Sequence, residues 1–403
     1  MEQEQQAGLL QGVRVLDLTR VLAGPFASMI LADFGAEVVK VELPVGGDEA
    51  RGFGPFVNGE SAYFASVNRG KKSVAVDLRN ERGQELARAL AGRCHLLLEN
   101  FRPGSMARFG LDYESLHAEH PRLVYASISG FGQTGPYAGR PAYDVIIQAM
   151  SGIASITGIE GQPPVRVGSS IADLSAALYG VIGMVAALAR ARETGMGQHL
   201  DVSMLDCQIA LLENAVARYD VTGEVPAPLG SRHPAITPFQ FFRAADGYLV
   251  IAAGNNRLWR SLCETVGTPE LCEDQRFATN ELRTRNHAEM EKLLAAPLAR
   301  RPVEEWCDLL GQAGVPCGPI HDIGEVVADP HVAARGAIRR QEVPAARSSI
   351  AVPASPLRFS QAGCVLEPRP APDLGQHTDE ILGELAGVSR DELDRLRSEG
   401  VIG

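Results

Sequence analysis

This sequence of 403 residues lacks the closely spaced cysteine pairs that are typical of redox and zinc sites. Its seven cysteines form an odd set, with no C-x-x-C pair and no spacing typical of zinc ligands. The turn that contains Cys317 allows two interpretations, a nucleophilic thiol or a small residue in a tight turn, and the second is the more ordinary one. We expect all seven to be reduced thiols: Cys94, Cys207, Cys263, Cys272, Cys307, Cys317 and Cys364.

The chain also lacks an excess of positive charge. Its formal net charge is −11, which argues against nucleic acid or an anionic membrane as the main partner, although a local basic pocket still allows an anionic ligand. The first six residues, MEQEQQ, are acidic and polar, unlike a secretory signal or an Arg-rich transit peptide. The apolar run 174–189 is short for a membrane span and rich in Ala and Gly, so we expect a cytoplasmic protein.

Signatures of several enzyme classes are missing as well. No G-x-G-x-x-G follows the first predicted strand, which argues against a classical NAD site. The nine histidines are scattered, with no pair at i, i+4 beside an acidic residue, so no metal site is expected. Ser203 has no G-x-S-x-G around it, which disfavours serine-hydrolase chemistry.

The first half does contain a regular alternation of apolar strands and helices. The short joints between 13–18, 23–35 and 37–42 indicate a βαβ unit, whose crossover is right-handed in a parallel sheet. The alternation predicts a doubly wound, Rossmann-like α/β domain. The predicted helices are 23–35 and 81–91, and the predicted strands are 13–18, 37–42, 73–77, 95–99, 123–129 and 199–203.

A change of composition separates a second region. Prolines cluster between 226 and 238, and two predicted strands then flank Asp246-Gly247, a strong hairpin signal. Helices at about 256–266, 280–299 and 302–313 follow, which predicts a small α+β domain. Elsewhere we expect one helix over 204–219, a short helix over 380–385 and a polar tail from 389. We divide the chain into the first part of the large domain, a linker, the small domain, and a linker that returns to the large domain: 1–205, 206–238, 239–325 and 326–403.

A single carboxylate precedes the longest apolar segment. Asp173 follows a small, flexible turn and stands before a nearly uninterrupted apolar helix that ends with Arg190, Arg192 and Gly195. Such a helix is expected to be packed on several sides. Asp173 has two compatible interpretations, an N-cap that accepts backbone N–H bonds or a nucleophilic or proton-transferring carboxylate. The helix dipole and nearby amides are expected to keep it ionised at neutral pH.

Basic residues gather at strand ends and loops of the first half. In an acidic protein they are candidates for an electropositive rim that binds a phosphate-bearing ligand, because open α/β sheets bind ligands at the carboxyl ends of their strands. For each of them taken alone, a solvated surface is the ordinary alternative. The candidates are Arg69, Lys71, Lys72, Arg79, Arg102, Arg108 and Arg140.

Several motifs resemble those of one enzyme family and appear in its order. They are LDLTRVLAGP at 16–25, FGAEVVKVE at 34–42, NRGKKS at 68–73, ENFRPG at 99–104, SGFGQTGP at 129–136, the Ala172-Asp173 turn, and LGQH at 374–377. Together they resemble the class III CoA-transferase family, of the CaiB/BaiF type, over almost the whole chain. The resemblance implies an obligate homodimer of two interlocked open rings. It also implies that both chain ends build the large domain, with the small domain inserted between them.

The resemblance also implies roles for individual residues. Asp173 matches the family's catalytic aspartate, which attacks the thioester and passes through a mixed anhydride to an aspartyl-CoA thioester. The loop 252–256 matches the glycine-rich flap, which implies that Gly254, Asn255 and Asn256 meet the substrate. Coenzyme A is then a substrate, and no tightly bound cofactor is implied. The contacts to CoA match Val21, Leu22, Ala23, Arg79, Asn100, Phe101, Arg108 and Arg140.

Two departures from the family pattern and two rival functions bear on the substrate. Leu22 and Leu43 stand where formyl-CoA transferases place Gln and Arg, which argues against formate or oxalate. In the same fold, α-methylacyl-CoA racemase carries Gly-His-Asp where this chain has Ala-Tyr-Asp at 142–144, and tyrosine is a poor base near neutral pH. We therefore favour a transferase. A catalytically dead CoA-binding or assembly protein fits poorly with Asp173 and the intact flap.

Among the transferases, the segment 19–25 and the Gly-Asn-Asn flap most resemble the succinyl-CoA:dicarboxylate enzymes of the glutarate type. Succinyl-CoA is then the donor, and a dicarboxylic acid such as glutarate, malate or a methylated relative is the acceptor. Arg20 is a candidate to hold the distal carboxylate with two hydrogen bonds, and a structural ion pair is an equally weighted alternative.

Overall fold

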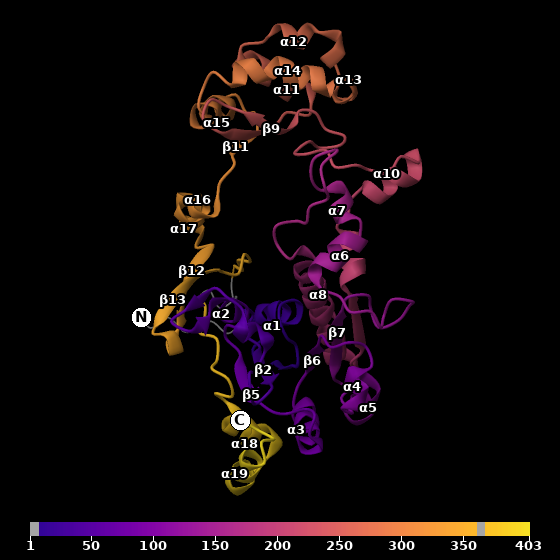
Figure 1. Cartoon of the computed structure of the whole chain (residues 1–403), viewed down its shortest axis with the longest axis vertical. Helices are drawn as coiled ribbons and strands as arrows, with labels where there is room; N and C mark the ends of the chain where they lie inside the picture. Colours follow the sequence, from indigo (N-terminus) through magenta and orange to yellow (C-terminus); the bar gives the residue numbers. More distant parts are fainter. Residues whose placement is uncertain (1–7, 361–366) are drawn as a thin grey trace. The chain divides into compact units, whose positions relative to one another are not determined.

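The computed structural model describes residues 8–360 and 367–403, and the chain divides into two compact units (Figure 1). The first unit comprises the described parts of Met1–Ile153, Arg166–Ala217 and Pro330–Gly403, and the second comprises Ala154–Val165 and Arg218–Asp329. We assigned 154–165 to the large domain, but it groups with the second unit, where Gly158 accepts a backbone hydrogen bond from Gly230. Cys364 lies outside the described residues, and the six described cysteines are free.

A six-stranded parallel sheet is the centre of the first unit, with the order β5-β2-β1-β6-β7-β8. The chain builds the sheet outward in one direction from β1 and in the other direction from β6. The switch point, at which α/β sheets bind ligands, is therefore between these two strands. The strands are β1 (Arg14–Asp17), β2 (Glu37–Glu42), β5 (Lys72–Ala75), β6 (Leu96–Glu99), β7 (Val124–Ser129) and β8 (His199–Ser203).

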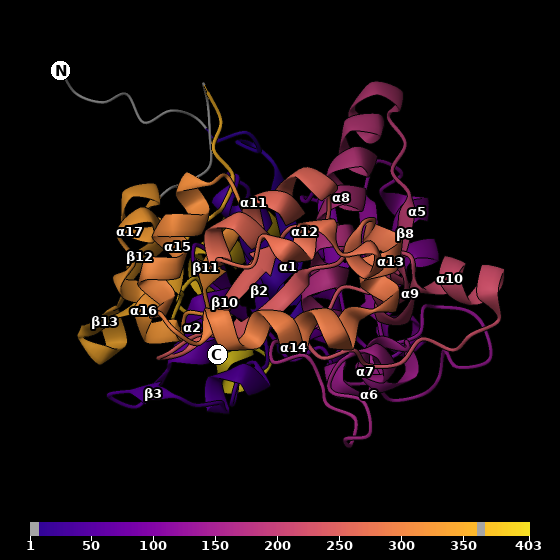
Figure 2. The same ribbon diagram turned by 90° about the horizontal axis from the view of Figure 1, so that it is seen from above.

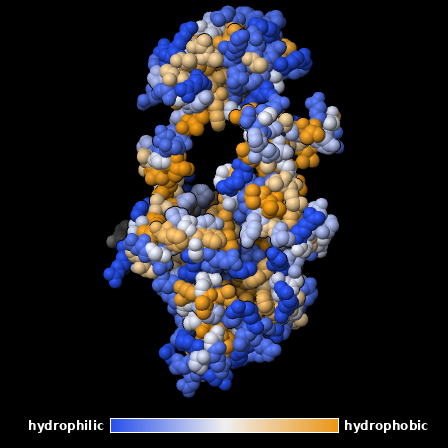
Figure 3. Space-filling model, viewed as in Figure 1, coloured by the Kyte–Doolittle hydropathy of each residue, from blue (hydrophilic) through white to orange (hydrophobic). Residues whose placement is uncertain are grey.

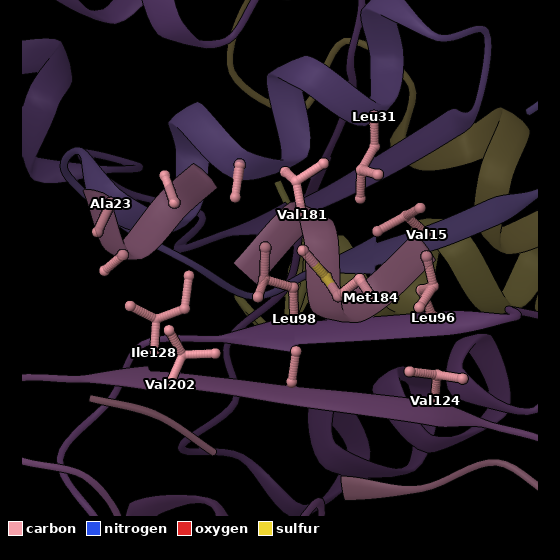
Figure 4. Close-up of a cluster of buried hydrophobic side chains, with 14 of the residues drawn as sticks. Val15, Ala23, Leu31, Leu96, Leu98, Val124, Ile128, Val181, Met184 and Val202 are labelled. Atoms are coloured by element: carbon pink, nitrogen blue, oxygen red, sulfur yellow. The ribbon is translucent and has the colours of Figure 1, made fainter. Parts of the chain in front are cut away.

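Helices cover both faces of this sheet, because neighbouring side chains of a strand point to opposite sides. On β1, Val15 lies in one hydrophobic core and Leu16 in the other. The first core joins the sheet to α1 (Ala23–Asp33), α8 (Ile171–Thr194) and α9 (Met204–Ala210), and Figure 4 shows Met184 of α8 among the side chains of the strands. This doubly wound arrangement explains why the strands read as continuous apolar runs.

The second core contains the chain's carboxyl-terminal segment. Beside α3 (Glu81–Ala91) and α5 (Tyr113–Glu119) it includes α18 (Thr378–Ala386) and α19 (Arg390–Ser398). The prediction of a polar tail from 389 was wrong. In α19, Leu393 and Leu396 are buried among charged neighbours, and Ile402 then forms a β-bridge with Val76. The amphipathic pattern of a helix with two apolar residues was too sparse to recognise.

Helix α8 is packed on one side and open on the other. It contacts α1, α6 (Asp144–Met150), α9, β7 and β8. Our expectation of burial on several sides is therefore wrong for the single chain, since Leu178 is 51% and Ile182 66% exposed. Among the described residues, α8 alone is long and apolar enough to cross a membrane by length and composition, and half of its most apolar window is buried inside the structure.

Shorter elements complete the first unit. A β-hairpin, β12 (Ile338–Val343) and β13 (Ser348–Pro353), stands in the region where we predicted only a linker. The predicted helix 204–219 is broken after α9 and resumes as α10 (Ala215–Thr222). The remaining elements here are η1 (Glu49–Gly52), β3 (Phe56–Val57), β4 (Glu60–Ser61), α2 (Ala62–Val67), α4 (Ser105–Arg108), α17 (Pro330–Arg335) and η3 (Pro344–Ala346). Helix α7 (Ile153–Ile156) begins at the last residue of this part of the first unit and continues into the second.

The second unit is an antiparallel sheet covered by helices (Figure 2). Strands β9 (Phe239–Arg243) and β10 (Tyr248–Ala252) form the predicted hairpin around Asp246-Gly247, and β11 (Cys317–Pro319) pairs with β10. The predicted helix 280–299 divides at Asn286. The helices are α11 (Asn256–Val266), α12 (Glu270–Glu273), η2 (Gln275–Phe277), α13 (Asn280–Arg285), α14 (His287–Leu298), α15 (Val303–Gln312) and α16 (Ile323–Ala328).

Candidate active site

A cavity of about 350 Å³ opens at the carboxyl ends of β1 and β6, at the switch point of the parallel sheet. Residues at the ends of three strands line it: Arg20–Ala23 after β1, Asn100–Pro103 after β6, and Ser129 and Gly130 at the end of β7. Asp173, in the first turn of α8, joins them. The cavity therefore has the position expected for a ligand site in an open α/β sheet, with a single carboxylate from α8 in its wall.

Asp173 is not the N-cap of α8. Ser170 occupies that position, and Asp173 follows it in the first helical turn. Burial, and then the charge of Asp144, raises the pKa of Asp173 from 3.8 to about 7. Our expectation that the helix dipole and nearby amides would keep this carboxylate ionised at neutral pH is therefore wrong, because burial and the charge of Asp144 both disfavour the ionised form. Near pH 7 both protonation states are populated.

Asp144 organises the start of α8. Its Oδ1 accepts a hydrogen bond from the backbone N–H of Ala172 at 2.8 Å, and its Oδ2 accepts one from Gln148 Nε2 at 2.7 Å. The guanidinium of Arg166 lies 3.9 Å from the same Oδ2. The sequence placed Asp144 only in the Ala-Tyr-Asp segment, where Tyr143 lines the cavity. Its hydrogen bond to α8 is a tertiary contact without a local sequence signal.

Tyr63 is a second residue near Asp173 that sequence reasoning missed. It belongs to α2, and burial together with the charge of Asp173 raises the pKa of its hydroxyl to about 12. The tyrosine is therefore a neutral hydrogen-bond donor over the whole physiological range. No motif of the sequence pointed to it.

The loop after β1 is fixed by side chains from other elements. Asn100 Oδ1 accepts the N–H of Arg20 at 2.9 Å, and Asn100 Nδ2 donates to the carbonyl of Arg20 at 2.8 Å. Asp48 Oδ1 accepts the N–H of Val21 at 3.0 Å. Val21 has a left-handed backbone with φ 68°, a conformation that costs a β-branched residue about 1–3 kcal/mol. This wall of the cavity is therefore rigidly held.

The side chain of Arg20 already has partners. Its Nη1 lies 3.0 Å from Glu49 Oε1, and its guanidinium stacks 4.7 Å above the ring of Phe101. Both members of the ion pair line the cavity and remain partly exposed. Arg20 therefore forms the structural ion pair that was our alternative to carboxylate binding. Because the pair lines the cavity, a ligand can still reach the guanidinium.

The structure brings most of the predicted site residues together, but not all. Arg79 lines a second cavity of about 200 Å³ and pairs with Asp77, at 2.8 Å. Arg108 lines neither cavity and donates to Ser105 Oγ at 3.1 Å. Leu43 lines the second cavity, which shares Arg20 and Phe101 with the first. The predicted residues in the first cavity are Arg20, Val21, Leu22, Ala23, Asn100, Phe101, Arg140 and Asp173.

Only some of the basic residues expected to form an electropositive rim line the cavity. Arg69 is buried and pairs with Asp33, and Lys71 is buried against Asp17, with Nζ to Oδ2 at 3.0 Å. Lys72 pairs with Glu37 and Glu380. Lys72 and Glu37 are the first residues of β5 and β2, so this pair lies at the amino ends of the strands, opposite the edge that holds the cavity. Arg69 and Lys71 are neutralised inside the fold and Lys72 at its partly exposed surface, so all three are structural. Arg102 and Arg140 do line the cavity.

The predicted flap lies in the second unit, and its side chains are engaged in the fold. Asn255 Oδ1 accepts the N–H of Leu258 and so caps α11. The buried guanidinium of Arg283 donates to the carbonyl of Gly254 at 2.9 Å and to Asn256 Oδ1 at 3.0 Å. These contacts occupy the side-chain oxygens of the two asparagines and the carbonyl of Gly254.

Two other candidates carry little chemistry. Cys317 packs beside Cys307, and burial raises the pKa of both thiols, so neither is an activated nucleophile. Among the described residues, no group of three or more His, Cys, Asp or Glu side chains is arranged to hold a metal ion.

Comparison with known proteins identifies the family. A family model described as CoA-transferase family III matches residues 10–378. The chain belongs to this family. Three relatives of this family III CoA-transferase match over nearly its full length. The succinyl-CoA:glutarate CoA-transferase of Mus musculus is 42% identical over 394 residues, which are 98% of this chain and 90% of the relative.

The other two relatives are similar to the same extent. The succinate–glutarate CoA-transferase of Agrobacterium fabrum is 40% identical, and the match covers 94% of this chain and 96% of the relative. The acetyl-CoA:oxalate CoA-transferase of Acetobacter aceti is 41% identical with the same coverage, 94% and 96%.

Solved structures agree with the fold. A CaiB/BaiF family protein from Brucella suis has a TM-score of 0.83 and 40% identity, and the match covers 94% of this chain and 100% of that one. A protein from Mycobacterium tuberculosis has a TM-score of 0.84 and 33% identity, with 94% and 100% coverage. The mixed α/β architecture with a parallel central sheet is thus the architecture of this CoA-transferase family.

Proposed function

We propose that this enzyme transfers CoA from succinyl-CoA to a dicarboxylic acid, with Asp173 as the covalent nucleophile. The observation that carries the proposal is the carboxylate of Asp173 in the wall of a cavity at the switch point of a family III CoA-transferase; the other carboxylate of that wall, Glu49, is paired with Arg20. The names of the two glutarate-type relatives support the substrate class, since both pair succinyl-CoA or succinate with glutarate, a dicarboxylic acid.

In the proposed reaction an oxygen of the ionised Asp173 attacks the thioester carbonyl of succinyl-CoA. The C–S bond breaks, which gives a mixed anhydride and CoA thiolate. The thiolate then attacks the carbonyl of Asp173, which releases succinate and leaves an aspartyl-CoA thioester. The acceptor carboxylate attacks this thioester in turn, and the thiolate finally moves to the acceptor's acyl carbon. The carboxylate of Asp173 is regenerated without net proton transfer.

The raised pKa of Asp173 suits this role. A carboxylate that is partly withdrawn from water is a more basic and more reactive nucleophile once ionised, since fewer solvent hydrogen bonds must be broken. Developing oxyanions need donors that are already in place. Backbone N–H groups near Asp173 and of Gly254, Asn255 and Asn256 are the proposed donors, and closure of the flap would protect the anhydride from water.

For CoA itself we propose contacts along the wall that follows β1 and β6. Val21, Leu22 and Ala23 supply backbone groups, while Asn100 and Phe101 supply the facing wall. Arg140 lines the same cavity, whereas Arg79 and Arg108 lie outside it. We therefore propose that these two arginines act on the distant phosphate groups of CoA. No tightly bound cofactor enters the proposed chemistry.

A second candidate, racemisation of a 2-methylacyl-CoA, is favoured by one observation. A pKa near 7 also suits a general acid or base, and Asp173 has it. Racemisation needs a second base on the opposite face of the α-carbon, however. Tyr143 stands at the position of the racemase histidine, and a phenol is a poor base for this proton transfer. The transferase therefore remains the better-supported function.

We also propose that the enzyme is the interlocked homodimer of its family. Figure 3 shows apolar side chains at the surface around α6 and α8. On α8 these are Leu178, Tyr179, Ile182 and Val185, and on α6 they are Val145, Ile146 and Met150. An apolar stripe along a core helix is unusual on a monomer and is typical of an obligate interface.

An acyl-exchange assay tests the proposed function. The purified protein is incubated with succinyl-CoA and a panel of mono- and dicarboxylates that includes glutarate, malate, oxalate and formate, and the CoA esters are read by mass spectrometry. We expect new CoA esters of dicarboxylates, with oxalate and formate poor acceptors, and no ester from Asp173→Ala. Deuterium uptake at the α-carbon of a 2-methylacyl-CoA, without any exchange, would instead identify the racemase.

A further inference from the structure

Val21 has an unusual backbone for its residue type. Four non-glycine residues in the described part of the chain have a left-handed backbone, and Val21, with φ 68°, is the β-branched one among them. Valine resists this conformation because its branched Cβ crowds the neighbouring carbonyl, so the surrounding structure must hold it. Val21 begins the stretch Val21–Ala23, which lines the cavity that contains Asp173.

A buried ion pair between Asp48 and Lys40 fixes the backbone of Val21. Asp48 Oδ1 accepts the N–H of Val21 at 3.0 Å and the N–H of Ala50 at 2.9 Å. The other oxygen, Oδ2, lies 2.9 Å from Lys40 Nζ, and both side chains are fully buried. Lys40 Nζ also donates to the carbonyl of Thr19 at 2.7 Å. The pair therefore binds the backbone on both sides of Arg20.

Neither member of the ion pair belongs to the loop that contains Val21. Lys40 comes from β2, and Asp48 is the N-cap of η1. Burial by itself would raise the pKa of Asp48, but Lys40 and the two backbone N–H groups hold it below its usual value. The acceptor of the Val21 N–H is thus a permanent carboxylate, and hydrogen bonds to charged acceptors are stronger than neutral ones.

We propose that Asp48, held in place by Lys40, is a positioning residue for CoA esters. It lines the second cavity but not the cavity of Asp173, and it acts by keeping Val21 left-handed, so that Val21–Ala23 presents its backbone to the ligand. This inference rests on the proposed contact of Val21–Ala23 with CoA. If the loop adopts other conformations as well, only a fraction of the molecules can bind CoA. The apparent affinity is then the intrinsic affinity multiplied by that fraction.

Calorimetric titration of the full-length protein with CoA tests the role of Asp48. Asp48→Ala is expected to weaken CoA binding about tenfold or more, because the loop is then populated in competing conformations. A second substitution, Val21→Gly in the Asp48→Ala protein, should restore the affinity to within about threefold of the wild type, since glycine adopts a left-handed backbone without steric strain. Simple loss of stability would not produce this recovery.

The matched control is Asp33→Ala, which removes another buried carboxylate of the same unit. Asp33 pairs with Arg69, and neither residue lines either cavity. This variant should bind CoA as the wild type does, even if it melts earlier. If Asp48→Ala does not fold, Asp48→Asn replaces it, because the amide oxygen still accepts the Val21 N–H. A loss of about threefold or less is then expected, and a loss above tenfold would contradict the proposal.

Unchanged CoA affinity in Asp48→Ala, or a double variant that binds no better than Asp48→Ala, would overturn the positioning role. Because the readout is binding of CoA itself, the result does not depend on which acyl donor or acceptor the enzyme uses. A failure of the succinyl-CoA assignment would appear only in the exchange assay, so the two failures are distinguishable.

Discussion

Asp144 Oδ1 accepts a hydrogen bond from the backbone N–H of Ala172, at 2.8 Å, and so fixes the start of α8 directly before Asp173. The same carboxylate raises the pKa of Asp173, in addition to the larger effect of burial. One residue therefore affects both the position and the protonation of the proposed nucleophile. The predictions about pH follow from this relationship.

Replacement of Asp144 by Asn should shift the pH dependence of the reaction. The amide oxygen still accepts the Ala172 N–H, but the negative charge that raises the pKa of Asp173 is gone. Because Asp173 attacks as a carboxylate, kcat/KM of the wild type should fall as the pH drops through about 7. In Asp144→Asn this acidic limb should move to lower pH, and an unmoved limb would contradict the electrostatic role.

Replacement of Asp173 by Asn should stabilise the protein, by an amount that grows as the pH rises from about 4 to about 7. The folded state binds the proton of Asp173 more tightly than the unfolded state, since its pKa rises from 3.8 to about 7, so ionisation costs stability as the pH rises through this range. At pH 8 the variant should be more stable by at most about 4 kcal/mol. At pH 5 the gain should fall to about 2 kcal/mol, because the unfolded state is still largely ionised there, and equal gains at both pH values would exclude this cause. Thermal unfolding at the two pH values measures it.

Arg20 should discriminate between acceptors. If its guanidinium binds the distal carboxylate, Arg20→Met should raise KM for dicarboxylates roughly tenfold or more and leave monocarboxylates unchanged. Equal values of KM for dicarboxylates in variant and wild type would remove this role. Glu49→Gln provides the converse test, because Glu49 competes for Arg20 at 3.0 Å. This variant should lower KM for dicarboxylates.

The open face of α8 should be an interface. Ile182→Asp places a charge on the apolar stripe, which is exposed in the single chain and would be buried in the dimer. Because a buried unpaired charge is strongly unfavourable, the variant should be monomeric or should not be recovered as soluble protein. Arg190→Asp, at an exposed position near the end of the same helix, is the control and should remain dimeric. Light scattering after gel filtration measures the mass. A monomeric wild type would contradict the interlocked homodimer.

Local sequence was sufficient for elements whose pattern is strong. The strand 37–42 and the helix 81–91 were predicted with their observed bounds, because the first is a β-branched apolar run and the second is amphipathic and begins after the N-cap Asn80. The carboxyl-terminal helix α19 and the hairpin of β12 and β13 were missed. Their apolar residues are few, and their burial depends on contacts with distant segments of the chain.

At the site, sequence motifs located the cavity walls but not their supports. Asp173, Asn100 and the stretch Val21–Ala23 came from the motifs and share one cavity. Asp144 and Asp48 were not assigned roles, because each acts through a hydrogen bond to a residue far along the chain. The protonation of Asp173 was also mispredicted, since burial is a property of the fold and not of the residue's neighbours in sequence.

The covalent intermediate provides the most direct test of the central claim. The enzyme is mixed with succinyl-CoA without an acceptor, quenched in acid, and digested for peptide mass spectrometry. We predict a CoA thioester on the peptide that contains Asp173, which disappears when glutarate is added before the quench, with glutaryl-CoA formed in equal amount. Exchange of acyl groups without any adduct on this peptide, or an adduct that persists in Asp173→Ala, would contradict nucleophilic catalysis by Asp173.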